Sequence, residues 1–134
     1  MRIPAFLSAL IAMAIPVPVA NASGGGSPGG EGTHFVEMPE IAVPITDSGR
    51  VGGELRVRLV LDATDEAAAK NIQEMMPVLR AAAVAASLEF ARLYASGMRA
   101  VDVAMLDQDL TVALQAADHG VARVLIVRVG AFPG

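Results

Sequence analysis

One strand-like segment limits the folds that are open to this chain. From Glu54 to Asp62, apolar and charged residues alternate. A period of two predicts a β-strand with one buried face and one solvated face. The expected buried residues are Leu55, Val57, Leu59 and Leu61, and the expected outward residues are Arg56, Arg58 and Asp62, with Val60 the exception. A sheet that contains this strand needs a second layer to cover its apolar side.

The rest of the sheet is predicted from the flanking segments. Residues 34–45 are rich in β-branched residues, but Pro39 and Pro44 remove ladder donors, which predicts an edge strand or an irregular one. Turn formers fill residues 46–53, so we expect a hairpin that joins two antiparallel strands. Residues 121–129 are nearly all apolar and predict a last strand that is more central than the first.

A long helix is expected after the second strand. Asp62 or Thr64 can cap it, and it should run to about Tyr94 or Ala95. Pro77 lies inside the apolar pattern and predicts either a kink or two abutting helices. The expected apolar stripe consists of Ala68, Ile72, Met75, Leu79, Ala83, Ala86, Phe90 and Leu93.

A shorter helix should span about Asp102 to Asp118 and end before Gly120. Its apolar face is expected to contain Met105 or Leu106, Leu110, Ala113 or Leu114, and Ala117. The order strand, strand, helix, helix, strand predicts a small two-layer α+β domain. About three strands would be covered by a long Pro-kinked helix and a shorter helix. If the second and last strands are parallel, their connection should be right-handed.

The N-terminal part of the chain differs in composition from this domain. Arg2 precedes an uncharged apolar run that contains two late prolines, and the small-x-small pattern Ala20-Asn21-Ala22 follows it. This order predicts a signal peptide over residues 1–22, with a retained membrane anchor as the alternative. Residues 23–33 are a Gly/Ser-rich linker, which leaves residues 34–134 for the folded domain. We therefore expect a protein exported across the bacterial inner membrane, either in the periplasm or anchored with a periplasmic domain.

Composition narrows the range of functions. The chain has no cysteine, which excludes disulfides, thiol catalysis and cysteine-based metal sites. The net charge is −4, and the basic residues are scattered. No basic cluster exists that could neutralise a run of phosphates, so we do not expect nucleic acid as a partner.

Few residues suggest chemistry. His34 borders the linker and His119 lies in a turn, and neither belongs to a metal-binding motif. Ser87 lies in mid-helix without the sharp turn of a nucleophile, which favours a packing role. Three acids lie close together but lack the glycine and closing glutamate of a calcium loop, and we expect them on a solvated helix face. These acids are Asp102, Asp107 and Asp109.

The sequence therefore predicts no catalytic, cofactor-binding or metal-binding residue, and a protein that is not an enzyme. An enzyme would need polar groups that converge in a pocket, for which the sequence offers few candidates. The candidate interface residues are Glu89, Arg92 and Tyr94, near the end of the long helix. Glu89 and Arg92 are three residues apart, so they can pair on the helix surface.

Three features resemble the flagellar basal-body-associated FliL family. An F-V-E-M-P strand at Phe35 is followed by a hairpin and an L-R-V-x-L-x-L strand. An acidic helix start then leads to a Met-Pro-x-x-Arg step, which is Met76-Pro77-Val78-Leu79-Arg80 here. Finally, a helix with Leu106, Leu110 and Leu114 leads into a β-rich C-terminus. The resemblance covers about residues 35–129.

This resemblance implies a non-enzymatic inner-membrane protein with a periplasmic domain. The domain would resemble stomatin-type domains, form homo-oligomeric rings, and associate with the flagellar basal body and the ion-driven stator. It would thereby support flagellar rotation, chemotaxis and motility. Members of the family keep the N-terminal helix as an anchor. A cut after Ala22 would instead give a soluble periplasmic adaptor or binding domain of FliL-like fold without a flagellar role.

Overall fold

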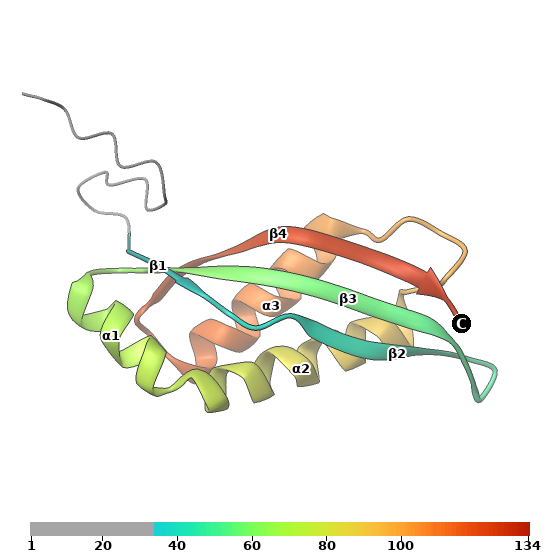
Figure 1. Ribbon diagram of the computed structural model, residues 1–134, viewed down its shortest axis with the longest axis horizontal. Helices are drawn as coiled ribbons and strands as arrows, with labels where there is room; N and C mark the ends of the chain where they lie inside the picture. Colours follow the sequence, from blue (N-terminus) through green and yellow to red (C-terminus); the bar gives the residue numbers. More distant parts are fainter. Residues whose placement is uncertain (1–33) are drawn as a thin grey trace, which may run out of the picture.

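The computed structural model describes residues 34–134. The predicted signal peptide or anchor (1–22) and the predicted linker (23–33) lie outside the described residues. The elements follow in the order β1 (His34–Glu37), β2 (Ile41–Asp47), β3 (Arg50–Ala63), α1 (Glu66–Glu74), α2 (Met76–Leu93), α3 (Val103–Ala117) and β4 (Val121–Pro133). They form an α+β domain of two layers, as the sequence predicts (Figure 1).

The sheet is built around β3, to which every other strand pairs in the antiparallel sense. β1 and β2 follow one another along one edge of β3, and β4 occupies the opposite edge. The predicted first strand is therefore two strands, interrupted at residues 38–40. Pro39 lies in this interruption, where no ladder donor is required. The sheet therefore has four strands, one more than the three or so that the sequence predicts.

Two predictions about the strands are wrong. β4 was expected to be more central than the first strand, but it lies at an edge and pairs only with β3 among residues 34–134. The consecutive apolar residues of β4 do not all face the core. Val124 faces the core, Leu125 faces away, and Val127 is the extra residue at a bulge. The hairpin loop is also shorter than the predicted 46–53. Ser48 and Gly49 alone form it, both with positive φ, as two-residue hairpin turns require.

The long helix is two abutting helices, one of the two outcomes expected from Pro77. Met75 ends α1 by donating its N–H to the Asn71 carbonyl, and it also precedes α2. Pro77 then lies in the first turn of α2, where its missing N–H costs nothing. The N-cap of α1 is Asp65 and not Asp62 or Thr64, since the Asp65 carboxylate accepts a hydrogen bond from the Ala68 N–H at 2.7 Å.

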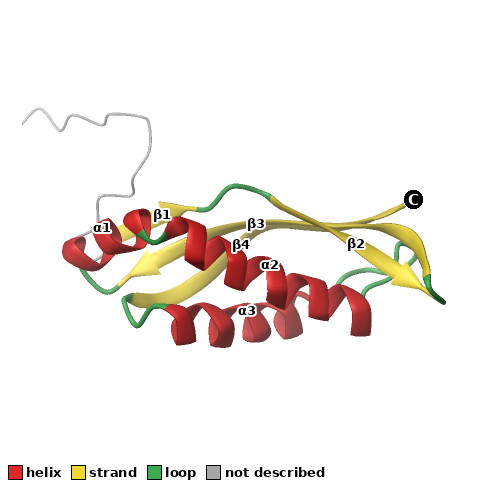
Figure 2. Cartoon of the chain, turned by 90° about the horizontal axis from the view of Figure 1, so that it is seen from below, coloured by secondary structure: helices red, strands yellow, loops and turns green. Residues whose placement is uncertain are grey.

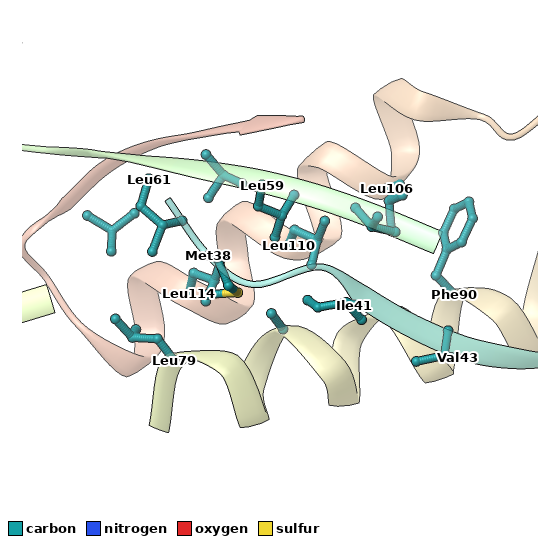
Figure 3. Close-up of a cluster of buried hydrophobic side chains, with 14 of the residues drawn as sticks. Met38, Ile41, Val43, Leu59, Leu61, Leu79, Phe90, Leu106, Leu110 and Leu114 are labelled. Carbon is teal, nitrogen blue, oxygen red and sulfur yellow. The ribbon is translucent and has the colours of Figure 1, made fainter. Parts of the chain in front are cut away.

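All three helices cover the same face of the sheet (Figure 2). α1 packs on β1 and the end of β3, α2 packs on β2, and α3 packs on β4. The core lies between the layers (Figure 3). The strand residues predicted to point inward, Leu55, Val57, Leu59 and Leu61, are all buried. Full burial of a side chain of this size contributes about 1.5–3 kcal/mol, so this layer contact is the main stabilising term.

The helix stripes differ from the prediction in α2. Met75 and Leu93 were expected in the core but are exposed, and Ser87 and Ala91 are buried in their place. A new helix, α2, begins after Met75. The side of α2 that faces the sheet is therefore the ridge formed by Leu79, Ala83, Ser87 and Ala91. In α3, Leu106, Leu110 and Leu114 are buried, so the leucine alternatives of the prediction are correct, whereas Ala117 was expected on this face but is exposed.

Candidate functional site

Two of the three predicted interface residues form an ion pair on the surface of α2. Arg92 donates from Nη2 to Glu89 Oε1 at 2.7 Å and from Nε to Glu89 Oε2 at 3.3 Å. Both side chains are more than half exposed. The two parallel hydrogen bonds match the guanidinium fork to the carboxylate and hold the pair in one geometry.

The ion pair shifts the acidity of both partners. The hydrogen bond from Arg92 lowers the pKa of the Glu89 carboxyl, with a smaller contribution from the positive charge itself. The reciprocal hydrogen bond to Glu89 raises the pKa of Arg92. Both groups are therefore charged at neutral pH, and the pair presents a local dipole with no net charge.

Tyr94 lies one residue past the end of α2 and does not join this pair. Its ring packs against buried Phe90, with 5.6 Å between the ring centroids and 49° between the ring planes. This tilted contact anchors the ring, while about half of the side chain remains exposed. Tyr94 thus presents an apolar ring and a hydroxyl at the surface.

A shallow apolar groove runs between α2 and α3. We call it the α2–α3 groove; it has a volume of about 410 Å³, and its lining residues are Ala86, Glu89, Leu93, Tyr94, Gln108, Asp109, Val112 and Ala113. Glu89 and Tyr94 border it, whereas Arg92 borders a different hollow, beside the hairpin end of β2. The structure therefore brings Glu89 to both Arg92 and the groove.

Two exposed aliphatic residues of the groove were not among the predicted interface residues. Leu93 is 50% exposed and Val112 is 65% exposed. Leu93 was assigned to the core stripe because its spacing from Phe90 fits a helix period. Val112 lies outside the helical stripe formed by Leu106, Leu110 and Leu114. Its place off this stripe could have identified it from the sequence as an exposed apolar residue.

The remaining polar residues serve the scaffold or lie apart. Asp102 caps α3 by accepting a hydrogen bond from the Met105 N–H at 3.1 Å. His34 lies on β1, while His119 lies in the turn before β4. Among residues 34–134, no three histidines or carboxylates come close enough together to hold a metal ion. Ser87 is fully buried, and its hydroxyl has no hydrogen-bond partner in this part of the chain.

The α2–α3 groove is suited to contact with a protein surface. Leu93 and Val112 supply apolar area, the Tyr94 hydroxyl can donate or accept a hydrogen bond, and Glu89 and Asp109 place carboxylates at the rim. Aromatic and aliphatic groups surrounded by polar ones are the usual composition of a protein–protein interface. A complementary partner would offer apolar side chains with hydrogen-bond donors around them.

No protein-family model matches the sequence, and no curated protein matches it. Within residues 34–134, none of the helices is both long and apolar enough to cross a membrane.

Proposed function

We propose that this chain is a non-enzymatic, FliL-like accessory of the flagellar basal body and stator that supports motility through protein–protein contacts. The observation that carries the proposal is the α2–α3 groove, where Leu93 and Val112 are left exposed beside the ring of Tyr94. Exposed apolar residues that gather around a groove favour a contact role.

The family resemblance supplies the flagellar part of this proposal. Its motifs lie at positions that organise the fold: the F-V-E-M-P segment spans β1 and the break after it, and the Met76-Pro77 step starts α2. The partner would be a stator or basal-body protein, and a second copy of the chain is a further expected partner. The domain would act in the periplasm, with the N-terminal segment as the only link to the membrane if that segment is not cut.

Deletion of the gene in a motile host tests the proposal. We expect the deletion strain to swim more slowly, with the largest defect in viscous medium, where the motor works under load. Swimming that is unchanged in both media would overturn the flagellar function.

Point variants then test the groove. Leu93→Glu places a charge among its apolar residues, so we expect it to fail to restore swimming to the deletion strain. Val78→Glu is the matched control, because Val78 is equally exposed on α2 but does not line the groove. If both variants restore swimming, the groove has no part in the function. An immunoblot must show that the two variants are present at equal levels.

A soluble periplasmic adaptor without a flagellar role is the alternative function. The Ala20-Asn21-Ala22 pattern favours it, because a cut there would free the domain from the membrane. Sequencing the mature N-terminus and fractionating the host cell distinguishes the two. Ser23 at the start of a soluble periplasmic protein favours the adaptor, and an intact N-terminus in the membrane fraction favours the anchored protein. Flagellar genes next to this one would also favour the motor role.

A further inference from the structure

The sheet has a face that no helix of the described chain covers. The three helices lie on the opposite side, as Figure 2 shows. We call this uncovered side the open face. The strand register places four arginines on it, two from β3 and two from β4: Arg56, Arg58, Arg123 and Arg128. The face also has exposed aromatic residues, Phe35 on β1 and Phe132 on β4.

Two of these arginines are neutralised within the face. Arg56 pairs with Glu54, two residues earlier on β3, and its guanidinium lies 5.2 Å from the centre of the Phe132 ring. Arg123 Nη2 lies 3.6 Å from Asp62 Oδ2 on the neighbouring strand. These two positions therefore have their partners already.

Arg58 and Arg128 are different. The register places them directly opposite one another on β3 and β4, and both are exposed. Among residues 34–134, neither forms an ion pair. Like charges directly opposite on a sheet destabilise the strand pair. An anion that bridges the two guanidinium groups would remove this repulsion.

A hollow borders each of the two arginines. The first, of about 550 Å³, is lined by Arg58 together with Pro39, Val60 and Val127. The second, of about 140 Å³, is lined by Arg128 together with Arg56, Gly130 and Phe132. Each arginine thus borders a recess of mixed polar and apolar lining, in which residues next to a bound carboxylate can lie.

Acidic residues at the edge of the face restrict what can bind. Glu37 and Glu40 line the first hollow, and Glu40 also lines the second. Their carboxylates would repel a dense array of negative charges such as a nucleic acid or an anionic lipid surface. A single carboxylate meets less repulsion than such an array, because it can lie over the guanidinium groups of Arg58 and Arg128 alone.

We propose that Arg58 and Arg128 together bind a single carboxylate side chain from a segment of a partner protein that lies extended across the open face. This inference rests on the sheet alone and does not depend on the flagellar function. It also uses the opposite side of the molecule from the α2–α3 groove, so one domain can contact two partners at once.

Peptide binding to the full-length protein tests the inference. The probe is a short fluorescein-labelled peptide in which one glutamate lies between valines and threonines, and its match has glutamine in place of that glutamate. We expect the glutamate peptide to bind about tenfold more tightly, which is the contribution of a charge-assisted hydrogen bond. The double variant Arg58→Gln/Arg128→Gln should lose this preference.

Matched controls separate the pair from general charge. Arg50→Gln/Arg99→Gln removes the same charge from exposed positions in the hairpin and in the α2–α3 connection, and it should keep the preference. Equal loss in both double variants, or no preference in the unaltered protein, overturns the inference. Amide shift changes in the unaltered protein, centred on residues 58 and 128, provide a second readout that needs no variant.

Two other occupants would also overturn it. If phosphatidylglycerol vesicles bind through Arg58 and Arg128 while the peptides show no preference, the face binds lipid. If the Arg58→Gln/Arg128→Gln variant changes only the sedimentation coefficient of the protein, the face binds a second copy of the chain. Neither measurement involves motility, so failure here and failure of the flagellar function are distinguishable.

Discussion

Ser87 is the one polar side chain in the core of the described domain. It lies on the ridge of α2 that faces the sheet, between Ala83 and Ala91. Small residues on this ridge let the helix backbone approach β2 closely. The packing role predicted for Ser87 thus agrees with its complete burial, but its hydroxyl is left without a partner.

Replacement of this serine should not weaken the fold. We expect Ser87→Ala to raise the free energy of unfolding by about 1 kcal/mol, because it removes a buried, unpaired hydroxyl and introduces the best helix former. Urea denaturation followed by circular dichroism measures the change. Destabilisation of similar size would mean that the hydroxyl makes a stabilising hydrogen bond.

The ion pair on α2 predicts a pH effect of defined sign. Arg92 lowers the pKa of Glu89 in the folded state. The stabilisation from the pair is therefore present above the pKa that Glu89 has in the unfolded chain, and it is lost as the pH falls through the lower folded value. Because both side chains are exposed, the effect on stability should be small.

Carboxyl NMR titration measures this shift directly. We expect the midpoint of Glu89 to move upward in an Arg92→Gln variant, since the variant removes the main cause of the lowered pKa. The chemical shifts of the other carboxylates serve as an internal reference. An unchanged midpoint for Glu89 would show that Arg92 does not pair with it in solution.

At the scale of elements, the contact between β3 and β4 depends on a glycine. A Cβ at Gly53 would collide with the Phe132 carbonyl oxygen on the neighbouring strand. A Cβ at the adjacent Gly52 would lie 3.6 Å from the Asp47 Cβ, which is an ordinary contact. Two neighbouring glycines in one strand therefore have different structural requirements.

This difference provides a matched pair of substitutions. We expect Gly53→Ala to lower the free energy of unfolding by about 1–3 kcal/mol, since the strands must move apart. Gly52→Ala should change it by less than about 0.5 kcal/mol. Thermal unfolding of both variants tests the prediction, and equal effects would contradict the crowding at Gly53.

At the scale of the whole molecule, stability comes from one layer of helices on one face of one sheet. Leu110 lies in the middle of α3 and is fully buried between the layers (Figure 3). Val112, two residues later on the same helix, is among the most exposed apolar residues. Substitutions at these two positions distinguish the core from the groove.

We expect Leu110→Ala to cost about 2–5 kcal/mol, because it removes buried methyl groups and leaves a cavity. Val112→Ala should change the free energy of unfolding by less than about 0.5 kcal/mol, while it weakens any partner contact at the α2–α3 groove. Chemical denaturation gives both values. A cost at Val112 as large as that at Leu110 would show that this side of α3 is covered in solution.

The pattern of residues within single segments was sufficient to predict much of this fold. The alternation from Leu55 to Leu61 predicted the buried face of β3, and Pro39 predicted an irregular edge. Pro77 predicted either a kink or a break between helices, and the break is present. The pairing of Glu89 with Arg92 was also expected, because residues three apart on a helix are neighbours whatever surrounds them.

Only the tertiary structure decided which residues remain at the surface. The sequence by itself determined the α+β class and the inward side of β3, since both follow from periodicity along a single segment. The central place of β3, the burial of Ser87, the exposure of Leu93 and the opposite register positions of Arg58 and Arg128 depend on partners far away in the chain. The physical reason is that a periodic pattern indicates only which side of a helix or strand is apolar. The rotation of a helix about its axis against the sheet, and the register between strands, follow from packing the whole core.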